Sequence, residues 1–195
     1  NRHRQILDAA LAVFSRKGYG QTTIPDIAAE AGVAVGTIYH YYQSKRDLLV
    51  TLIHTYAKSE RLSQAFARAD REDKGTSVRT ILGNGLDWPA GDLKGFIFIL
   101  TEVLRDPDLG QHFSGQFLGS LLQSMEHFLG ERVSSGEFRQ LDQRVTARAI
   151  GGMVLGFLIL KEMEGDRSPA KGMPLPDLTA EMADIILEGI EKRGA

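Results

Sequence analysis

Apolar residues recur along most of the chain at intervals of three and four, which is the period of one face of an α-helix. The first such segment predicts a helix over about residues 4–17 that ends at Gly18. Strict alternation of apolar and polar residues, which would indicate β-strands, is almost absent. The pattern therefore predicts an all-α protein. The apolar positions of the first helix are Ile6, Leu7, Ala10, Leu11 and Phe14.

Two capping boxes mark the starts of further helices. Thr23 stands three residues before Asp26, and Ser44 stands three before Asp47. In this motif the hydroxyl accepts a hydrogen bond from the backbone N–H three residues on, and the acidic side chain bonds back. We therefore expect a second helix from Thr23, a very short third helix over about 35–42, and a long fourth helix from Ser44.

Beyond about residue 70 the periodicity predicts five more helices, and the stretch 164–177, with three prolines and two glycines, predicts a loop. The expected fold has about nine helices. It consists of an N-terminal three-helix helix-turn-helix domain over residues 1–48 and a C-terminal helical bundle domain over residues 49–195. The five later helices are expected near 77–87, 93–105, 109–134, 142–163 and 178–192.

The short third helix presents hydrogen-bonding groups on its outward face. If Ile38 faces the core, Tyr42 lies one turn further on the same side. Two short helices joined by a tight turn have helix-turn-helix geometry, in which the second helix enters the major groove of DNA. Hydroxyls and an imidazole can bond base edges and phosphates, and a glycine permits close backbone approach. The outward residues are Gly36 and His40, flanked by Thr37, Tyr39 and Tyr41.

Charge is distributed unevenly along the chain. The formal net charge is −2, yet residues 1–48 hold six basic and four acidic side chains. A mildly basic head on an acidic body is typical of a protein whose first domain contacts DNA.

Composition argues against several other classes. The chain has no cysteine, so disulfides, thiolate zinc sites and a cysteine nucleophile are excluded. The longest apolar run, residues 149–160, is too short to span a bilayer, and no export signal is recognisable. We therefore expect a cytoplasmic protein without membrane contact. The histidines, which lack metal-ligand spacing, are His3, His40, His54, His112 and His127.

The residues of the helix-turn-helix resemble a known family. The stretches 22–28 (TTIPDIA), 31–42 (AGVAVGTIYHYY) and 44–49 (SKRDLL) are similar to the N-terminal domain of tetracycline-repressor (TetR) family regulators, over about residues 4–52. At Tyr42 the family more often has phenylalanine. The resemblance implies a homodimeric bacterial repressor that binds double-stranded operator DNA and is released by a small-molecule effector.

The resemblance also implies roles for single residues. Thr37, His40 and Tyr41 would face the bases, and Tyr39 and Lys45 would bind phosphates. Thr23 would add a contact at the start of its helix. The alternative for Thr23 is that it acts only as a helix cap.

The resemblance places the dimer contact in the last two helices, and small residues between 148 and 160 independently favour this. Two glycines one turn apart let a partner helix approach closely. The alternative is tight packing within one subunit; phosphate binding is disfavoured because no strand precedes the glycines. The predicted interface residues are Ala149, Gly152, Met153, Gly156 and Leu160.

The effector pocket is expected among the helices between about residues 60 and 140, and its ligand is expected to be small and largely apolar. For each aromatic residue the alternative is plain core packing. The candidate lining residues are Trp88, Phe96, Phe98, Glu102, Phe113, Phe117 and Met125.

Two other functions remain as alternatives. An enzyme is disfavoured because no nucleophile elbow, catalytic triad or P-loop is recognisable, and no cofactor is expected. A DNA-binding architectural protein without an effector would leave about 150 acidic, apolar-rich residues without a role.

Overall fold

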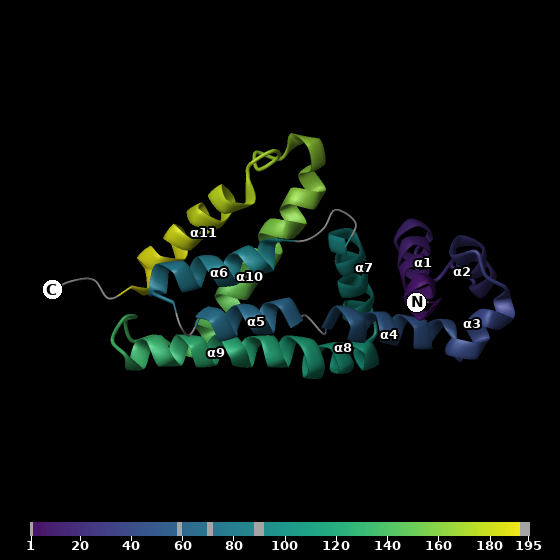
Figure 1. Cartoon of the computed structure of the whole chain (residues 1–195), viewed down its shortest axis with the longest axis horizontal. Coiled ribbons are helices and arrows are strands. Elements are labelled where there is room, and N and C mark those ends of the chain that lie inside the picture. Colours follow the sequence, from purple (N-terminus) through teal and green to yellow (C-terminus); the bar gives the residue numbers. More distant parts are fainter. Residues whose placement is uncertain (1, 58–59, 70–71, 88–91, 192–195) are drawn as a thin grey trace. The chain divides into compact units, whose positions relative to one another are not determined.

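The computed structural model describes residues 2–57, 60–69, 72–87 and 92–191. Within these ranges it contains eleven α-helices, a five-residue π-helical segment and one 3-10 turn (Figure 1). In place of strands, the described part has a single isolated β-bridge between Phe138 and Glu191. The all-α prediction is therefore confirmed.

The chain divides into two compact units. The first comprises residues 1–58 and 89–117, and the second comprises residues 59–88 and 118–195. This grouping places the segment 89–117 with the N-terminal helices. The expected domain boundary at residue 48 stays a prediction. The helices of the first unit are α1 (Arg2–Lys17), α2 (Ile24–Ala31), α3 (Val35–Tyr41), α4 (Lys45–Ala57), α7 (Asp92–Arg105) and α8 (Pro107–Phe113). The helices of the second unit are α5 (Glu60–Ala69), α6 (Lys74–Leu86), α9 (Gly119–Ser134), α10 (Gln143–Glu164) and α11 (Leu175–Ile190).

The caps of α2 form as the sequence predicts. Thr23 Oγ1 accepts a hydrogen bond from the Asp26 backbone N–H, and the Asp26 carboxylate accepts one from the Thr23 N–H at 3.0 Å. Gly32 ends the helix with φ +62°, in the left-handed region that favours glycine. The start of α4 differs in one detail. Ser44 Oγ accepts from the Asp47 N–H, but the Asp47 carboxylate accepts from the N–H of Gln43.

Helix α7 belongs to the first unit because it packs against α1. The ring of Phe98 stacks on that of Phe14 with centroids 5.7 Å apart. Leu11 lies against Gly95, where a Cβ would come within 2.5 Å of Leu11 Cδ2. Phe14 is completely buried, so this contact forms part of the core of the first unit.

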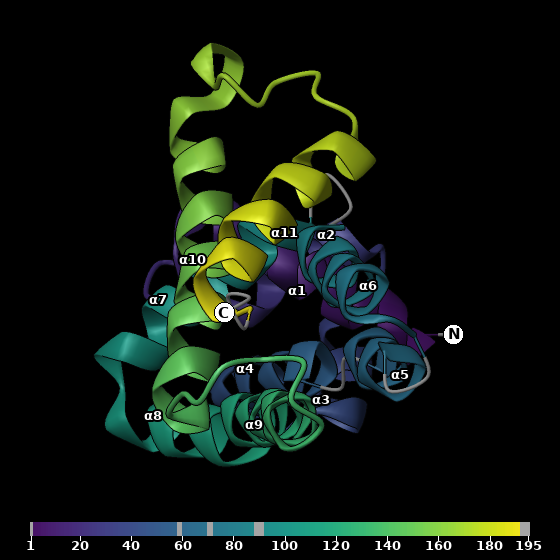
Figure 2. The same ribbon diagram turned by 90° about the vertical axis from the view of Figure 1, so that its left-hand side faces the viewer.

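In the second unit α6 packs against both α5 and α11, and α9 packs against α5 and α10. Figure 1 shows α9 running beside α5, and in Figure 2 α5, α6 and α9 are seen nearly end-on while α10 runs upright to one side. The core of this unit is formed by the facing apolar stripes of these helices, including Phe66, Leu82, Phe128, Leu129 and Ile186.

The structure divides one helix that was expected to be continuous. The long helix expected from Ser44 begins as α4, and residues 58–59, which follow α4, lie outside the described residues. The helix expected over 109–134 is divided into α8 and α9 by the π-helical segment Ser114–Leu118. Helix α8 also begins earlier than predicted, because the Asp106 carboxylate caps the N–H groups of Asp108 and Leu109.

Candidate functional site

The outward face of α3 is exposed as the helical phase predicts. Ile38 is completely buried and Tyr42 is 3% exposed, whereas Tyr39 is 56% and Tyr41 is 44% exposed. The intervening His40 is also exposed. The helix therefore anchors one side in the core and presents phenol and imidazole groups on the other.

Two smaller residues complete this face. Gly36 is exposed, and a Cβ placed on it would meet nothing within 4 Å. Thr37 is half-buried, and its backbone N–H bonds to the Ala34 carbonyl. The backbone at the start of α3 is therefore open to close approach by a partner as large as a DNA duplex.

The end of α3 is held by the start of α1. The Tyr42 hydroxyl is hydrogen-bonded to His3 Nδ1 at 2.9 Å, and the two rings stack with centroids 5.3 Å apart. Burial raises the pKa of Tyr42 to about 12, and the nearby Asp47 and Tyr41 act in the same direction. Tyr42 therefore remains neutral at physiological pH and orients α3 rather than contacting a ligand.

Lys45, predicted to bind a phosphate, is engaged within the chain. Its ammonium donates to the carbonyls of Tyr19 at 2.6 Å and Thr22 at 2.8 Å, with the Gly20 carbonyl at 3.4 Å. It also lies 4.4 Å from the centroid of the Tyr19 ring. The contacts show that Lys45 ties the α1–α2 connection to α4. Its phosphate contact stays a prediction.

Thr23 is exposed and acts as the cap of α2. The carboxylate that it faces, Asp26, also pairs with Lys17 at 2.7 Å. The hydrogen bond from Lys17, together with those from Thr23, lowers the pKa of Asp26 to about 2. The Asp26 carboxyl group of the capping box is therefore fully ionised at neutral pH.

The described residues predicted to line an effector pocket fall in both units. Phe96 and Phe113 are buried in the first unit with ring centroids 6.5 Å apart, and Phe98 stacks on Phe14 in the same unit. Phe96 and Phe113 are buried and Phe98 is half-buried, which is compatible with plain core packing, and their role in a pocket stays a prediction. Glu102 forms an ion pair with Arg105 at 3.5 Å. Trp88 and the side chain of Phe117 lie outside the described part of the structure.

Met125 lines a cavity inside the second unit, the one described residue of the predicted set to do so. The wall of the cavity is contributed by five helices and is entirely apolar. Sequence reasoning missed the other wall residues because their helical spacing is that of any buried stripe. The lining residues are Phe66, Val78, Ile81, Leu82, Met125, Phe128, Leu129, Ile150, Ile186 and Ile190.

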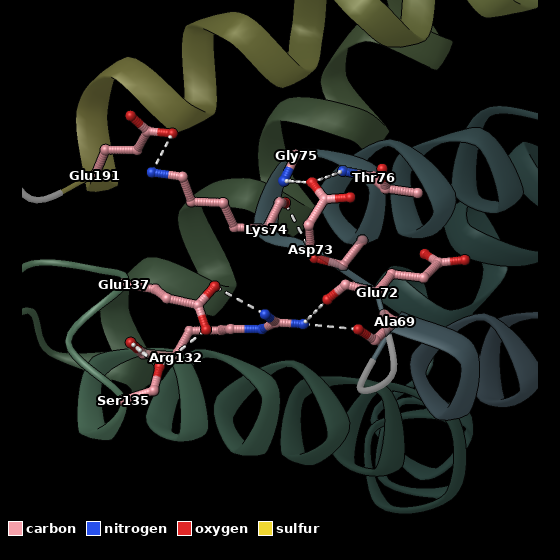
Figure 3. A network of polar contacts seen from close by, with 11 residues as sticks. Ala69, Glu72, Asp73, Lys74, Gly75, Thr76, Arg132, Ser135, Glu137 and Glu191 are labelled. Carbon is pink, nitrogen blue, oxygen red and sulfur yellow. Dashed lines mark hydrogen bonds and ion pairs between the residues drawn. The ribbon is translucent and has the colours of Figure 1, made fainter.

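A buried arginine, Arg132, adjoins a wall residue of this cavity, and Figure 3 shows the polar contacts of its guanidinium. The Arg132 guanidinium lies 5.3 Å from the centroid of Phe128, a wall residue. Its Nη2 donates to the carbonyls of Ala69 and Glu72, each at 2.7 Å, and its Nη1 pairs with Glu137 at 2.8 Å. Arg132 therefore ties α9 to the end of α5 and to the residue before the cap of α6.

Helix α10 has an inner and an outer face. On the inner face Ala147 and Leu158 are buried, and Val154 lies 3.6 Å from a Cβ placed on Gly85 of α6. The predicted interface residue Met153 is half-buried, whereas Ala149 and Gly152 are exposed. A Cβ on Gly152 or Gly156 would meet nothing within 4 Å, so the described chain does not pack against these glycines. The large apolar side chains of the outer face are Val145 (65% exposed), Leu160 (58%) and Met163 (74%).

No group of three or more histidine, aspartate or glutamate side chains in the described residues could hold a metal ion. Across the same residues, no helix has both the length and the apolar character needed to cross a membrane.

Comparison with known proteins identifies the N-terminal motif. Residues 6–52 match the model of the family described as bacterial regulatory proteins, tetR family. The fatty acid metabolism regulator protein of Bacillus subtilis is 30% identical over 161 residues, which cover 78% of this chain and 79% of the relative.

Solved structures agree with this relationship over almost the whole chain. The regulator FadR from Bacillus subtilis, solved in complex with stearoyl-CoA, is 26% identical with a TM-score of 0.74, covering 96% of this chain and 99% of the other. The fatty acid degradation regulator FadR from Bacillus halodurans shares the fold with a TM-score of 0.79 at 24% identity, covering 99% and 98%. The chain belongs to the TetR family of bacterial regulatory proteins.

Proposed function

We propose that this protein is a homodimeric transcriptional repressor that binds operator DNA through α3 and is released by a small, largely apolar effector. The observation that carries the proposal is the division of α3 and its C-cap into a buried side, Ile38 and Tyr42, and an exposed side rich in hydrogen-bonding groups. A recognition helix needs this division, because one side must be held rigidly while the other enters the major groove. The protein would act in the cytoplasm, where bacterial DNA lies.

The residues of the exposed face would divide the work of recognition. Thr37, His40 and Tyr41 would contact base edges, with Gly36 allowing close approach of the backbone. Tyr39 and Lys45 would contact phosphates, and Thr23 would add a contact at the start of α2. For Lys45 this contact requires the ammonium to exchange a carbonyl partner for a phosphate.

The cavity of the second unit supports an apolar effector. Its wall offers no hydrogen-bonding side chain, so it suits an alkyl or acyl chain. The room inside is about 20 Å³, little more than one water molecule needs. An effector with more than a few carbon atoms must therefore push apart the helices that line the cavity. This separation of the helices would link effector binding to DNA release. The stearoyl-CoA complex of the Bacillus subtilis relative favours a fatty acyl thioester.

The outer face of α10 supports the dimer. Val145, Leu160 and Met163 are large apolar side chains exposed on one side of a single helix, and they flank two glycines without neighbours. Exposed apolar groups in such a row are typical of an interface. A second copy of the chain would cover them and would place two α3 helices on successive half-sites.

The test is DNA binding with and without the effector class. Fluorescence anisotropy would follow a duplex enriched by the protein from random-sequence DNA, titrated with stearoyl-CoA, with free coenzyme A as the control. Release by stearoyl-CoA alone supports the proposal. Tight binding that neither compound disturbs would favour the effector-independent DNA-binding protein.

A matched pair of variants tests the cavity as the effector site. Met125→Gln keeps the length of the side chain but puts a polar amide into the apolar wall of the cavity, whereas Gln123→Met changes an exposed position of the same helix. We expect the first variant to bind DNA and to resist stearoyl-CoA, and the second to respond like the wild type. Equal responses from the two variants would place the effector elsewhere.

A further inference from the structure

We propose that the first turn of α1 extends the DNA interface, with Arg2 and Arg4 contacting phosphates beside the groove that α3 enters. This inference rests on the proposed function and deepens it. It names a DNA-contacting surface outside the helix-turn-helix motif itself.

The first turn of α1 lies beside the recognition helix. His3 stacks on Tyr42 with centroids 5.3 Å apart and meets the exposed Tyr41 edge-on at 6.3 Å. Consecutive Cα atoms are about 3.8 Å apart, so the backbones of Arg2 and Arg4 both lie next to that of His3. The two arginines therefore flank a residue that touches the recognition helix on its DNA-facing side.

Hydrogen bonds fix the position of the first turn of α1. The Gln5 side-chain amide donates to the Ala31 carbonyl at the end of α2, at 2.7 Å. The Tyr42 hydroxyl holds His3 at 2.9 Å. The first turn of α1 is therefore tied to both helices of the helix-turn-helix, and it must move with them when they dock on DNA.

Most of the basic side chains in residues 1–48 already have close partners within the chain. Arg16, Lys17 and Arg46 pair with Glu30, Asp26 and Asp106 at 2.7, 2.7 and 2.5 Å. Lys45 donates to backbone carbonyls. These four cations must give up close partners before they can bind a phosphate.

Arg2 and Arg4 are held much less firmly. Arg2 donates to the neutral Gln5 side-chain oxygen at 3.1 Å. Arg4 lies 3.9 Å from Asp8, and the two side chains are 82% and 69% exposed. An exposed pair at this distance is weak and is screened by salt, so both guanidinium groups can turn toward a phosphate at little cost. The excess positive charge of residues 1–48 is therefore most available at the start of α1.

The test uses the salt dependence of binding. The Arg2→Gln/Arg4→Gln double variant and the wild type would be titrated with the duplex enriched by the wild type from random-sequence DNA, and with a scrambled duplex, between 0.05 and 0.2 M salt. Each lost phosphate contact lowers the slope of log K against log salt by about 0.9. The double variant removes two contacts from each subunit and so about four from the dimer, and its slope should fall by about 3.6 units. The affinity change across this fourfold range of salt should then shrink by on the order of 100-fold.

Two control variants isolate the phosphate contacts. Arg2→Lys/Arg4→Lys keeps both charges and should retain the wild-type slope. Arg16→Gln removes a cation that is paired with Glu30 and should leave the slope unchanged. Circular dichroism and thermal melting should be the same for all variants, because the replaced side chains are exposed.

The outcomes separate this inference from the proposed function. If the wild type enriches no duplex, the proposed function fails. If the wild type binds and the double variant keeps both its slope and its affinity, the start of α1 does not contact DNA and this inference fails alone. A loss on the enriched duplex without a change of slope would also overturn it, because that is the mark of a base contact.

Discussion

Lys45 contacts Tyr19 twice, since its ammonium donates to the Tyr19 carbonyl at 2.6 Å and lies 4.4 Å from the centroid of the Tyr19 ring. The residue predicted to bind a phosphate is thus also the one that ties the start of α4 to the α1–α2 connection. The Lys45 ammonium is thus held by a charged hydrogen bond and by a cation–π contact to the same residue.

This contact predicts a stability effect at Lys45. Lys45→Met keeps the length of the side chain but removes its donors, and we expect the free energy of unfolding to fall by about 1–2 kcal/mol. Urea denaturation measures it. Lys171→Met, which breaks an exposed pair with Asp166, should change stability by less than about 0.5 kcal/mol. Equal stability of Lys45→Met and wild type would show that these intrachain contacts of Lys45 do not stabilise the fold.

The α1–α7 contact predicts a different outcome at two helical glycines. Gly95→Ala would place a Cβ within 2.5 Å of Leu11 Cδ2, so overpacking should cost about 1–3 kcal/mol. Gly130→Ala meets nothing within 4 Å and should be neutral or stabilising by up to about 1 kcal/mol, because alanine favours helix. Thermal unfolding of the two variants measures the difference. If Gly95→Ala is as stable as Gly130→Ala, Leu11 is not confined against α7.

Acid should weaken the capping box of α2. The pKa of Asp26 is lowered from 3.8 to about 2, first by the hydrogen bond from Lys17 and then by those from Thr23. A carboxyl group with a lowered pKa in the folded state contributes its full stability above about pH 4 and loses it as the pH falls toward 2. The unfolding free energy of the wild type should therefore fall in this window, and that of Asp26→Asn should fall less steeply.

The cause of the lowered pKa has its own test. In Lys17→Met the largest contribution is removed, so the pKa of Asp26 should rise toward its ordinary value. NMR of the side-chain carboxyl carbon follows this titration directly. An unchanged Asp26 titration in Lys17→Met would assign the shift to the Thr23 hydrogen bonds alone.

The exposed face of α3 predicts a loss of DNA affinity without a loss of folding. Tyr41→Ala or His40→Ala should weaken binding to the enriched duplex by about 1–3 kcal/mol, the range for a lost base contact. Circular dichroism should be unchanged, because both side chains are exposed. Glu131→Ala, exposed on α9 of the second unit, is the control and should bind like the wild type. Full affinity in both α3 variants would move the recognition face elsewhere.

The outer face of α10 predicts an effect on assembly. Gly156→Leu has room within its own chain, so the monomer should still fold. In a dimer the added side chains would push the two α10 helices apart, at about 1–3 kcal/mol for each subunit. Sedimentation velocity should show a dimeric wild type and a weakened dimer in Gly156→Leu, with operator affinity falling in parallel. Gly130→Leu is the control on another helix. A monomeric wild type at micromolar concentration would contradict the dimer.

Some features of the molecule depend on contacts within a few residues, and the sequence by itself determined these. The capping box at Thr23 and Asp26 joins groups three positions apart, and Gly32 ends α2 because of its own backbone freedom. The burial of Ile38 beside the exposure of Tyr39 follows from helical phase alone. For this reason the helix-turn-helix and its outward face were predictable from local order.

Other features join residues far apart in the chain, and only the tertiary structure decided them. Helical spacing predicts that Phe98 has an inward side, but not that this side meets the ring of Phe14. Lys45 reaches a carbonyl 26 residues away, and Arg132 reaches one 63 residues away. The apolar cavity exists because stripes from five helices fail to fill the space between them. That mismatch of volumes belongs to no single segment, and so no pattern along the sequence carries it.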